Sequence, residues 1–166
     1  MVLVEDEAKV QRESDLKAIW YLQGVQPTIR VEQVKEAHSF YGALNVRSGK
    51  CHLKDFTWQT SKNTVIFLEA LEHIYKGKDV LLIWDGAGHH RGEVKNYLKR
   101  KNKKWNLHIE YFPPYSPDLN PQEMVWKQGK ANTAHNSEEE FQDKLYKFRQ
   151  YIVKTKFKTN FLSKYS

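Results

Sequence analysis

Residues 79–85 read DVLLIWD, and this stretch sets the fold class. The apolar run 80–84 shows no alternation with polar residues, which predicts a strand covered on both faces, as in parallel sheets packed between helices. Asp85 follows this strand directly. In open sheets of this class, ligands bind beyond the carboxyl ends of the strands, so Asp85 lies where a functional side chain is expected.

The chain on either side of this strand has two different periodicities. Upstream, β-rich stretches separated by turn residues, with a hairpin signal at Ser48-Gly49, predict a meander of antiparallel strands. Downstream of Ser61, helical spacing alternates with further strands. The predicted strands cover residues 1–7, 18–24, 27–34, 39–46, 51–59, 79–84 and 107–112, and the predicted helices cover 61–77, 92–104, 120–132 and 137–164. This order predicts one α/β domain over residues 1–166, with helices around a mixed sheet.

Composition narrows the class of protein further. The chain has 27 Lys and Arg against 20 Asp and Glu, and its formal net charge of +7 favours a polyanionic partner. Cys51 is the only cysteine, which excludes an intrachain disulfide and a cysteine-based zinc site. No stretch resembles a signal peptide or a membrane span. We therefore expect a cytoplasmic protein without a membrane partner, associated with the nucleoid if the source is prokaryotic.

Two aspartates are placed to share a site. Asp6 ends the first apolar run, and Asp85 follows the strand 79–84. Carboxylates held close together raise each other's pKa unless a cation neutralises them. Oxygen ligands of this kind suit Mg²⁺ or Mn²⁺, and a pair of such ions can activate a nucleophile and stabilise a leaving oxygen of a phosphodiester.

Glu123 is the candidate for a third acid, and it also has a structural interpretation. Asn120 and Pro121 have the residue types of a helix N-cap and first helical position. Glu123 then falls at the third helical position, where a carboxylate can accept from the backbone N–H of the cap and suits the helix dipole. Local sequence leaves both roles of Glu123 open.

Three motifs in the chain resemble a known family. VEDEA at 4–8, LLIWDGAGHH at 81–90 and YFPPYSPDLNPQEMVW at 111–126 are similar to the three catalytic blocks of DDE transposases, specifically the insertion-sequence-630/mariner group. The order of the blocks also matches, with 37 residues between Asp85 and Glu123. The resemblance implies an RNase H-like fold with a mixed five-stranded sheet flanked by helices.

The resemblance also implies a role for individual residues. Asp6, Asp85 and Glu123 correspond to the catalytic acids, which in the family hold two Mg²⁺ ions, with Mn²⁺ able to substitute. His90 and Asn120 correspond to positions that support the site. The implied activity is cleavage of DNA at the ends of a mobile element, followed by joining of the freed ends to target DNA.

Basic residues crowd one predicted helix and the turn after it. They are Lys95, Lys99, Arg100, Lys101, Lys103 and Lys104. Contact with DNA phosphates is the functional interpretation, and a solvated charged face is the structural alternative.

The family pattern predicts more than this chain contains. The resemblance implies a helix-turn-helix region before the catalytic domain, whereas here the first catalytic strand begins at residue 1. We therefore expect the end-binding region to be separate or missing, and the active form to be a homodimer. A truncated regulator that binds DNA without cutting it, and a standalone RNase H-like nuclease, are the alternative functions.

Overall fold

The computed structural model of the chain describes residues 1–12, 36–114, 116–133 and 140–161. In this part of the chain, five strands form one mixed sheet in the order β3-β2-β1-β4-β5. The strands are β1 (Val2–Gln11), β2 (Ala37–Asn45), β3 (Cys51–Phe56), β4 (Asp79–Trp84) and β5 (Asn106–Tyr111). The predicted antiparallel meander is confirmed for β1, β2 and β3, and β4 pairs in parallel with both β1 and β5. The strands predicted at 18–24 and 27–34 lie outside the described residues.

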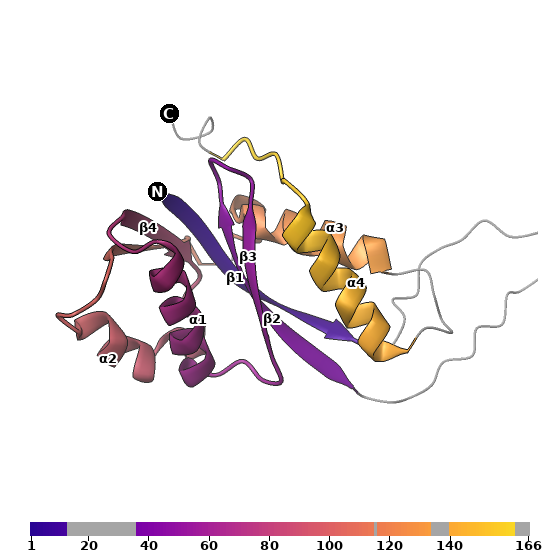
Figure 1. Cartoon of the computed structure of the whole chain (residues 1–166), viewed down its shortest axis with the longest axis horizontal. Coiled ribbons are helices and arrows are strands. Elements are labelled where there is room, and N and C mark those ends of the chain that lie inside the picture. The colour runs from indigo at the N-terminus through magenta and orange to yellow at the C-terminus, as the bar shows by residue number, and fades with distance from the viewer. Residues whose placement is uncertain (13–35, 115, 134–139, 162–166) are drawn as a thin grey trace, which may run out of the picture.

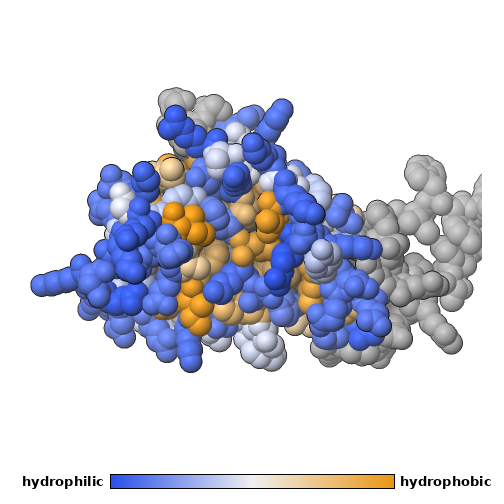
Figure 2. Space-filling view, viewed as in Figure 1, coloured by the Kyte–Doolittle hydropathy of each residue, from blue (hydrophilic) through white to orange (hydrophobic). Residues whose placement is uncertain are grey.

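Helices cover both faces of the sheet (Figure 1). α1 (Ser61–Ile74) and α2 (Glu93–Lys99) lie on one side, and α3 (Pro121–Thr133) and α4 (Phe141–Lys154) lie on the other. Short 3-10 turns precede two of them, η1 (Gly88–His90) before α2 and η2 (Pro117–Leu119) before α3. In the same view, apolar side chains gather between α1 and α4, whereas most of the surrounding surface is hydrophilic (Figure 2). None of the helices in the described part of the chain is long and apolar enough to span a membrane.

The sheet separates two hydrophobic cores because successive side chains of a strand point to opposite faces. Leu3, Leu82 and Trp84 belong to the core under α1 and α2, and Ala8 and Val10 belong to the core under α3 and α4. On β4, the residues that face α1 are fully buried, whereas Leu81 and Ile83 on the other face are only partly buried. The prediction of a strand covered on both faces is therefore wrong for the second face, because α3 packs on β1 and β2 and α4 packs on β3.

Two helices are shorter than the sequence predicts. α2 ends at Lys99 rather than Lys104, because the basic run that follows has no apolar side chain to pack until Trp105. α4 ends at Lys154 rather than at residue 164. The residues after Lys154 alternate between exposed lysines and a buried aromatic ring, a period of two that suits an extended chain.

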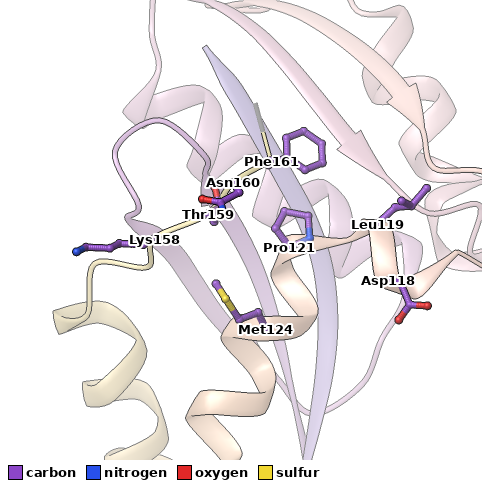
Figure 3. Close-up of a pocket in the computed structure, with 8 residues that line it drawn as sticks. All are labelled: Asp118, Leu119, Pro121, Met124, Lys158, Thr159, Asn160 and Phe161. Carbon is purple, nitrogen blue, oxygen red and sulfur yellow. The ribbon is translucent and has the colours of Figure 1, made fainter. Parts of the chain in front are cut away.

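The extended segment after α4, residues 155–161, crosses the turn between β2 and β3. The Phe157 side chain is buried, and its N–H donates to the Gly49 carbonyl at 2.8 Å. Gly49 has a φ of +71°, and a β-carbon there would lie 2.4 Å from the Phe157 carbonyl oxygen. Residues 158–161 and the start of α3 then line a cavity of about 400 Å³ (Figure 3). This segment closes the core at one end of the sheet.

Candidate active site

Asp6 lies in the middle of β1 rather than at the end of the strand. The parallel pairing of β1 with β4 stops at Val4 and Ile83, but β1 continues because it pairs on its other side with β2 as far as Gln11. Asp6 is the second residue after Val4, just as Asp85 is the second residue after Ile83. Since Asp85 is the first residue after β4, the two aspartates occupy neighbouring positions at one edge of the parallel pair.

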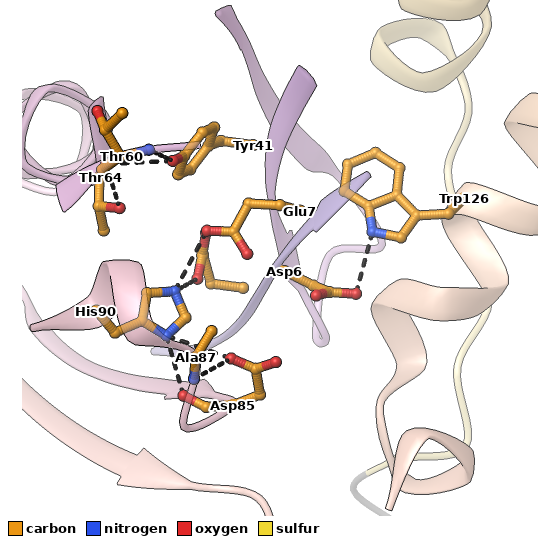
Figure 4. Close-up of polar contacts among 10 residues, drawn as sticks. Asp6, Glu7, Tyr41, Thr60, Thr64, Asp85, Ala87, His90 and Trp126 are labelled. Atoms are coloured by element: carbon orange, nitrogen blue, oxygen red, sulfur yellow. Dashed lines mark hydrogen bonds and ion pairs between the residues drawn. The ribbon is translucent and has the colours of Figure 1, made fainter. Parts of the chain in front are cut away.

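Gly42 brings α3 close to Asp6. It is the partner of Asp6 in the register of β1 and β2. A β-carbon at Gly42 would lie 2.3 Å from Cη2 of Trp126, so only glycine lets the indole pack directly on the strand. The Trp126 Nε1–H donates to Asp6 Oδ2 at 3.2 Å (Figure 4). Glu123 lies three residues before Trp126, on the same side of α3.

The cap of α3 involves Asn120 rather than Glu123. Asn120 Oδ1 accepts from the Gln122 N–H at 2.9 Å, as an N-cap side chain does. The Asn120 N–H, which a capping-box glutamate would need, donates instead to the Pro117 carbonyl at 2.9 Å. The side chain of Glu123 is exposed. The structural interpretation of Glu123 as a capping-box residue is therefore wrong, and its carboxylate faces solvent near Asp6.

The charge of Asp6 is strongly perturbed by its surroundings. Burial, then the negative charges of Glu7 and Glu123, raise the pKa of Asp6 from 3.8 to about 7, and Asp85 raises it further. These are the effects expected of carboxylates that share a site without a cation. Asp6, Asp85 and Glu123 come from three different elements, so the fold concentrates negative charge at this edge of the sheet.

Asp85 is fixed by its own loop while its carboxylate stays accessible. Its Oδ1 accepts from the Ala87 N–H at 2.8 Å, a turn in which an aspartate bonds the backbone two residues on. The side chain is 53% exposed, which leaves it open to a ligand. Asp85 thus combines a defined orientation with access to solvent.

His90 lies behind this edge, on the α1 side of the sheet. Its ring stacks on Trp84 with centroids 4.1 Å apart, and its Nδ1 lies 3.0 Å from the Asp85 carbonyl oxygen. Its Nε2 lies 3.3 Å from Glu5 Oε2 and 3.3 Å from Glu7 Oε1. Glu5 and Glu7 are absent from the residues predicted for the site. The alternation within VEDEA contains the signal, because it places Glu5 and Glu7 on the face opposite Asp6.

The C-terminal end of the predicted basic cluster lies away from the acids. The backbone carbonyl of Lys104 accepts a hydrogen bond from the Gly77 N–H, beside the start of β4. Because β4 has six residues, its two ends are about 17 Å apart. Arg100 contacts Glu69 and the ring of Tyr97, and Lys103 Nζ donates to backbone carbonyls. Arg100 and Lys103 thus have partners within the chain.

Comparison with known proteins agrees with this geometry. The sequence profile described as DDE superfamily endonuclease matches residues 1–146. The chain belongs to this family. No curated protein matches this DDE endonuclease domain significantly in sequence.

Solved structures identify the fold of the domain. The Mos1 transposase paired-end complex with left transposon end is similar, with a TM-score of 0.71 and 14% identity over 93% of this chain and 48% of that chain. The Mos1 mariner paired-end complex with Mn has a TM-score of 0.64 and 16% identity, over 93% of this chain and 48% of the other. The catalytic core domain of BIV integrase has a TM-score of 0.55 and 13% identity, over 96% of this chain and 87% of that one.

The fold is therefore RNase H-like, as the resemblance implied. The domain spans about half the length of the Mos1 chains that it resembles.

Proposed function

We propose that this domain is the catalytic part of a DNA transposase, which cleaves DNA at the ends of a mobile element and joins those ends to target DNA. The observation that carries the proposal is the convergence of three carboxylates at one edge of the sheet. The register of β1 and β4 places Asp6 beside Asp85, and the Trp126 contact with Asp6 brings up α3, the helix that carries Glu123. Family membership and the likeness to Mos1 complexes support the reaction class.

Divalent ions fit the donor set at this edge. Asp6, Asp85 and Glu123 offer only carboxylate oxygens, which are ligands that Mg²⁺ and Mn²⁺ prefer. The mutual repulsion that raises the pKa of Asp6 is relieved when a cation is present. When bound, two such ions supply activation of the attacking oxygen and neutralisation of charge on the leaving oxygen.

The protein's own residues then hold and orient these carboxylates. Trp126 fixes one oxygen of Asp6 through its indole N–H, and the Ala87 N–H fixes Asp85. Asn120 supports the site by capping α3, the helix that carries Glu123. We assign Asp6, Asp85 and Glu123 as the ligands and Asn120 and His90 as supporting residues.

DNA is the proposed substrate, and contacts with its phosphates extend beyond the acids. The exposed lysines of the basic cluster, Lys95, Lys99, Lys101 and Lys104, lie on the side of the sheet covered by α1 and α2 or at its far end. The length of β4 corresponds to about five base pairs of duplex. A duplex that runs from the acids toward the start of β4 therefore brings phosphates about five base pairs from the cleavage site to the lysines near the start of β4. Recognition of specific ends by a separate helix-turn-helix region and pairing of two copies belong to the same proposal.

Nicking of supercoiled plasmid tests the reaction without knowledge of the end sequence. We expect the purified chain to nick plasmid DNA with Mn²⁺ and to lose this activity in Asp85→Ala. Glu110→Ala is the matched control, because Glu110 is an exposed glutamate on the neighbouring strand β5.

The same assay separates the alternative functions. Binding of DNA without nicking, even with preformed element ends, would favour the truncated regulator. Cleavage confined to RNA–DNA hybrids would favour the standalone nuclease.

A further inference from the structure

Three charged side chains are buried on the face of β1 opposite Asp6. The side chains of Glu5, Glu7 and His90 are 0%, 4% and 2% exposed. Glu5 and Glu7 flank Asp6 in the strand and point away from it, toward α1. Burial of carboxylates at this density is costly, so their placement beside the proposed catalytic edge needs an explanation.

One ring joins the two strands that carry the aspartates. His90 Nδ1 lies 3.0 Å from the carbonyl oxygen of Asp85 and 3.3 Å from its Oδ1. Because the carbonyl can only accept, Nδ1 is the donor in that contact. Nε2, on the other side of the ring, lies 3.3 Å from both Glu5 Oε2 and Glu7 Oε1. Figure 4 shows the ring between β1 and the loop that follows β4.

The ring acts where the backbone no longer connects these strands. The parallel pairing of β1 with β4 ends at Val4 and Ile83, before either aspartate is reached. Beyond that point, no ladder hydrogen bond between β1 and β4 in the described residues sets the distance between Asp6 and Asp85. Stacking on Trp84 fixes the plane of the His90 ring in the same place.

We infer that Glu5, Glu7 and His90 form a positioning clamp that sets the separation of Asp6 and Asp85 before a divalent ion binds. The inference rests on the proposed function. His90 supplies the positive charge between the two glutamates, and its second nitrogen holds the Asp85 loop. The clamp residues thus act through the aspartates and touch neither substrate nor ion.

Two carboxyl groups and one imidazole ring make up the clamp, so the charge of the ring offsets that of one glutamate only. His90 Nδ1 faces a carbonyl oxygen and its Nε2 faces two carboxylates, all of which accept, so both ring nitrogens donate and the ring carries a positive charge. Neither oxygen of Glu5 makes a well-aligned hydrogen bond within the described residues, so its contact with His90 is an ion pair.

A purely structural role and a positioning role predict different results for an apolar replacement. Replacing a buried ion cluster by apolar side chains of similar volume is often neutral or stabilising. The triple variant Glu5→Met, Glu7→Met, His90→Leu removes the clamp while keeping the core filled. A structural role predicts a stable and fully active triple variant, whereas the clamp predicts a stable variant with an impaired ion site.

The test is plasmid nicking by the full chain as a function of Mn²⁺ concentration, with thermal unfolding in parallel. Loss of partners that orient metal ligands typically costs 10- to 100-fold in metal affinity or activity. We expect the half-saturating Mn²⁺ concentration of the triple variant to rise by about that factor. The DNA concentration that gives half-maximal nicking is expected to change little. If the triple variant does not fold, His90→Gln is measured in the same way and is expected to shift in the same direction.

Glu72→Gln is the matched control. Glu72 is also a buried glutamate, and it accepts from the Tyr97 hydroxyl at 2.7 Å, near the opposite end of the sheet. Its replacement is expected to lower the unfolding temperature without changing the Mn²⁺ dependence. A general effect of disturbing a buried carboxylate would instead change the Mn²⁺ dependence of both variants.

Three outcomes would overturn the clamp, and they are distinguishable. Wild-type Mn²⁺ dependence in a folded variant would refute it while leaving the proposed function intact. Mn²⁺ binding could survive in the triple variant Asp6→Asn, Asp85→Asn, Glu123→Gln and disappear in His90→Gln. That result would show that Glu5, Glu7 and His90 themselves bind the ion. If the wild-type chain neither nicked DNA nor bound Mn²⁺ in calorimetry, the proposed function would fail and the clamp with it.

Discussion

Replacing Asp6 by Asn is expected to stabilise the ion-free protein while abolishing nicking. Burial and the charges of Glu7 and Glu123 raise the pKa of Asp6 from 3.8 to about 7. A carboxyl group whose pKa is raised on folding contributes stability below pH 3.8, and this contribution is lost as the pH rises through 7. At 1.36 kcal/mol for each pKa unit, the ionised Asp6 costs about 4 kcal/mol above pH 7. Asparagine avoids this cost and can still accept from Trp126.

Urea unfolding with EDTA at pH 8 and pH 5 measures the effect of Asp6→Asn. We expect the variant to exceed wild type in free energy of unfolding by up to about 4 kcal/mol at pH 8, with the difference shrinking toward pH 4. Added Mn²⁺ is expected to stabilise wild type and leave Asp6→Asn unchanged. Asp118→Asn, at an exposed aspartate, is the control. Equal stability of Asp6→Asn and wild type at pH 8 in EDTA would refute the electrostatic reasoning.

Three further perturbations test the surrounding structure. Gly42→Ala forces the Trp126 indole off β2, and so away from Asp6. It is expected to cost about 1–3 kcal/mol and to abolish Mn²⁺-dependent nicking. Gly129→Ala, which clashes with α4 instead, should lose stability but retain nicking. Lys99→Glu with Lys101→Glu should reduce the slope of DNA affinity against salt by about two, and an unchanged slope would exclude phosphate contacts there. Phe157→Ala should cost about 3–5 kcal/mol in chemical denaturation, because the ring is buried; a cost below about 1 kcal/mol would show that residues 155–161 do not close the core.

Much of the fold follows from local pattern. The apolar runs predicted β1 and β4, and the turn at Ser48-Gly49 predicted the hairpin. Helical spacing predicted α1, and the capping residues Asn120 and Pro121 predicted α3. Several errors fall at the ends of elements, and another concerns β4, whose second face is only partly buried. α2 and α4 end early because tertiary contacts decide how far a helix continues, as the Phe157 contact with Gly49 does after α4.

The sequence by itself determined which residues are candidates for chemistry. Three motifs in a fixed order named Asp6, Asp85 and Glu123, and the capping residues before Glu123 named the helix that carries it. These features are local, so side-chain type and spacing along the chain are enough to find them.

Only the tertiary structure decided how those residues are arranged and what surrounds them. It excluded the capping-box contact of Glu123, because the Asn120 N–H already has a partner in the loop before α3. It also joined Glu5 and Glu7 to His90, 83 residues further along the chain from Glu7. The physical reason is that strand order and strand register fix which distant side chains meet, and no local pattern around residue 5 or residue 90 contains that pairing.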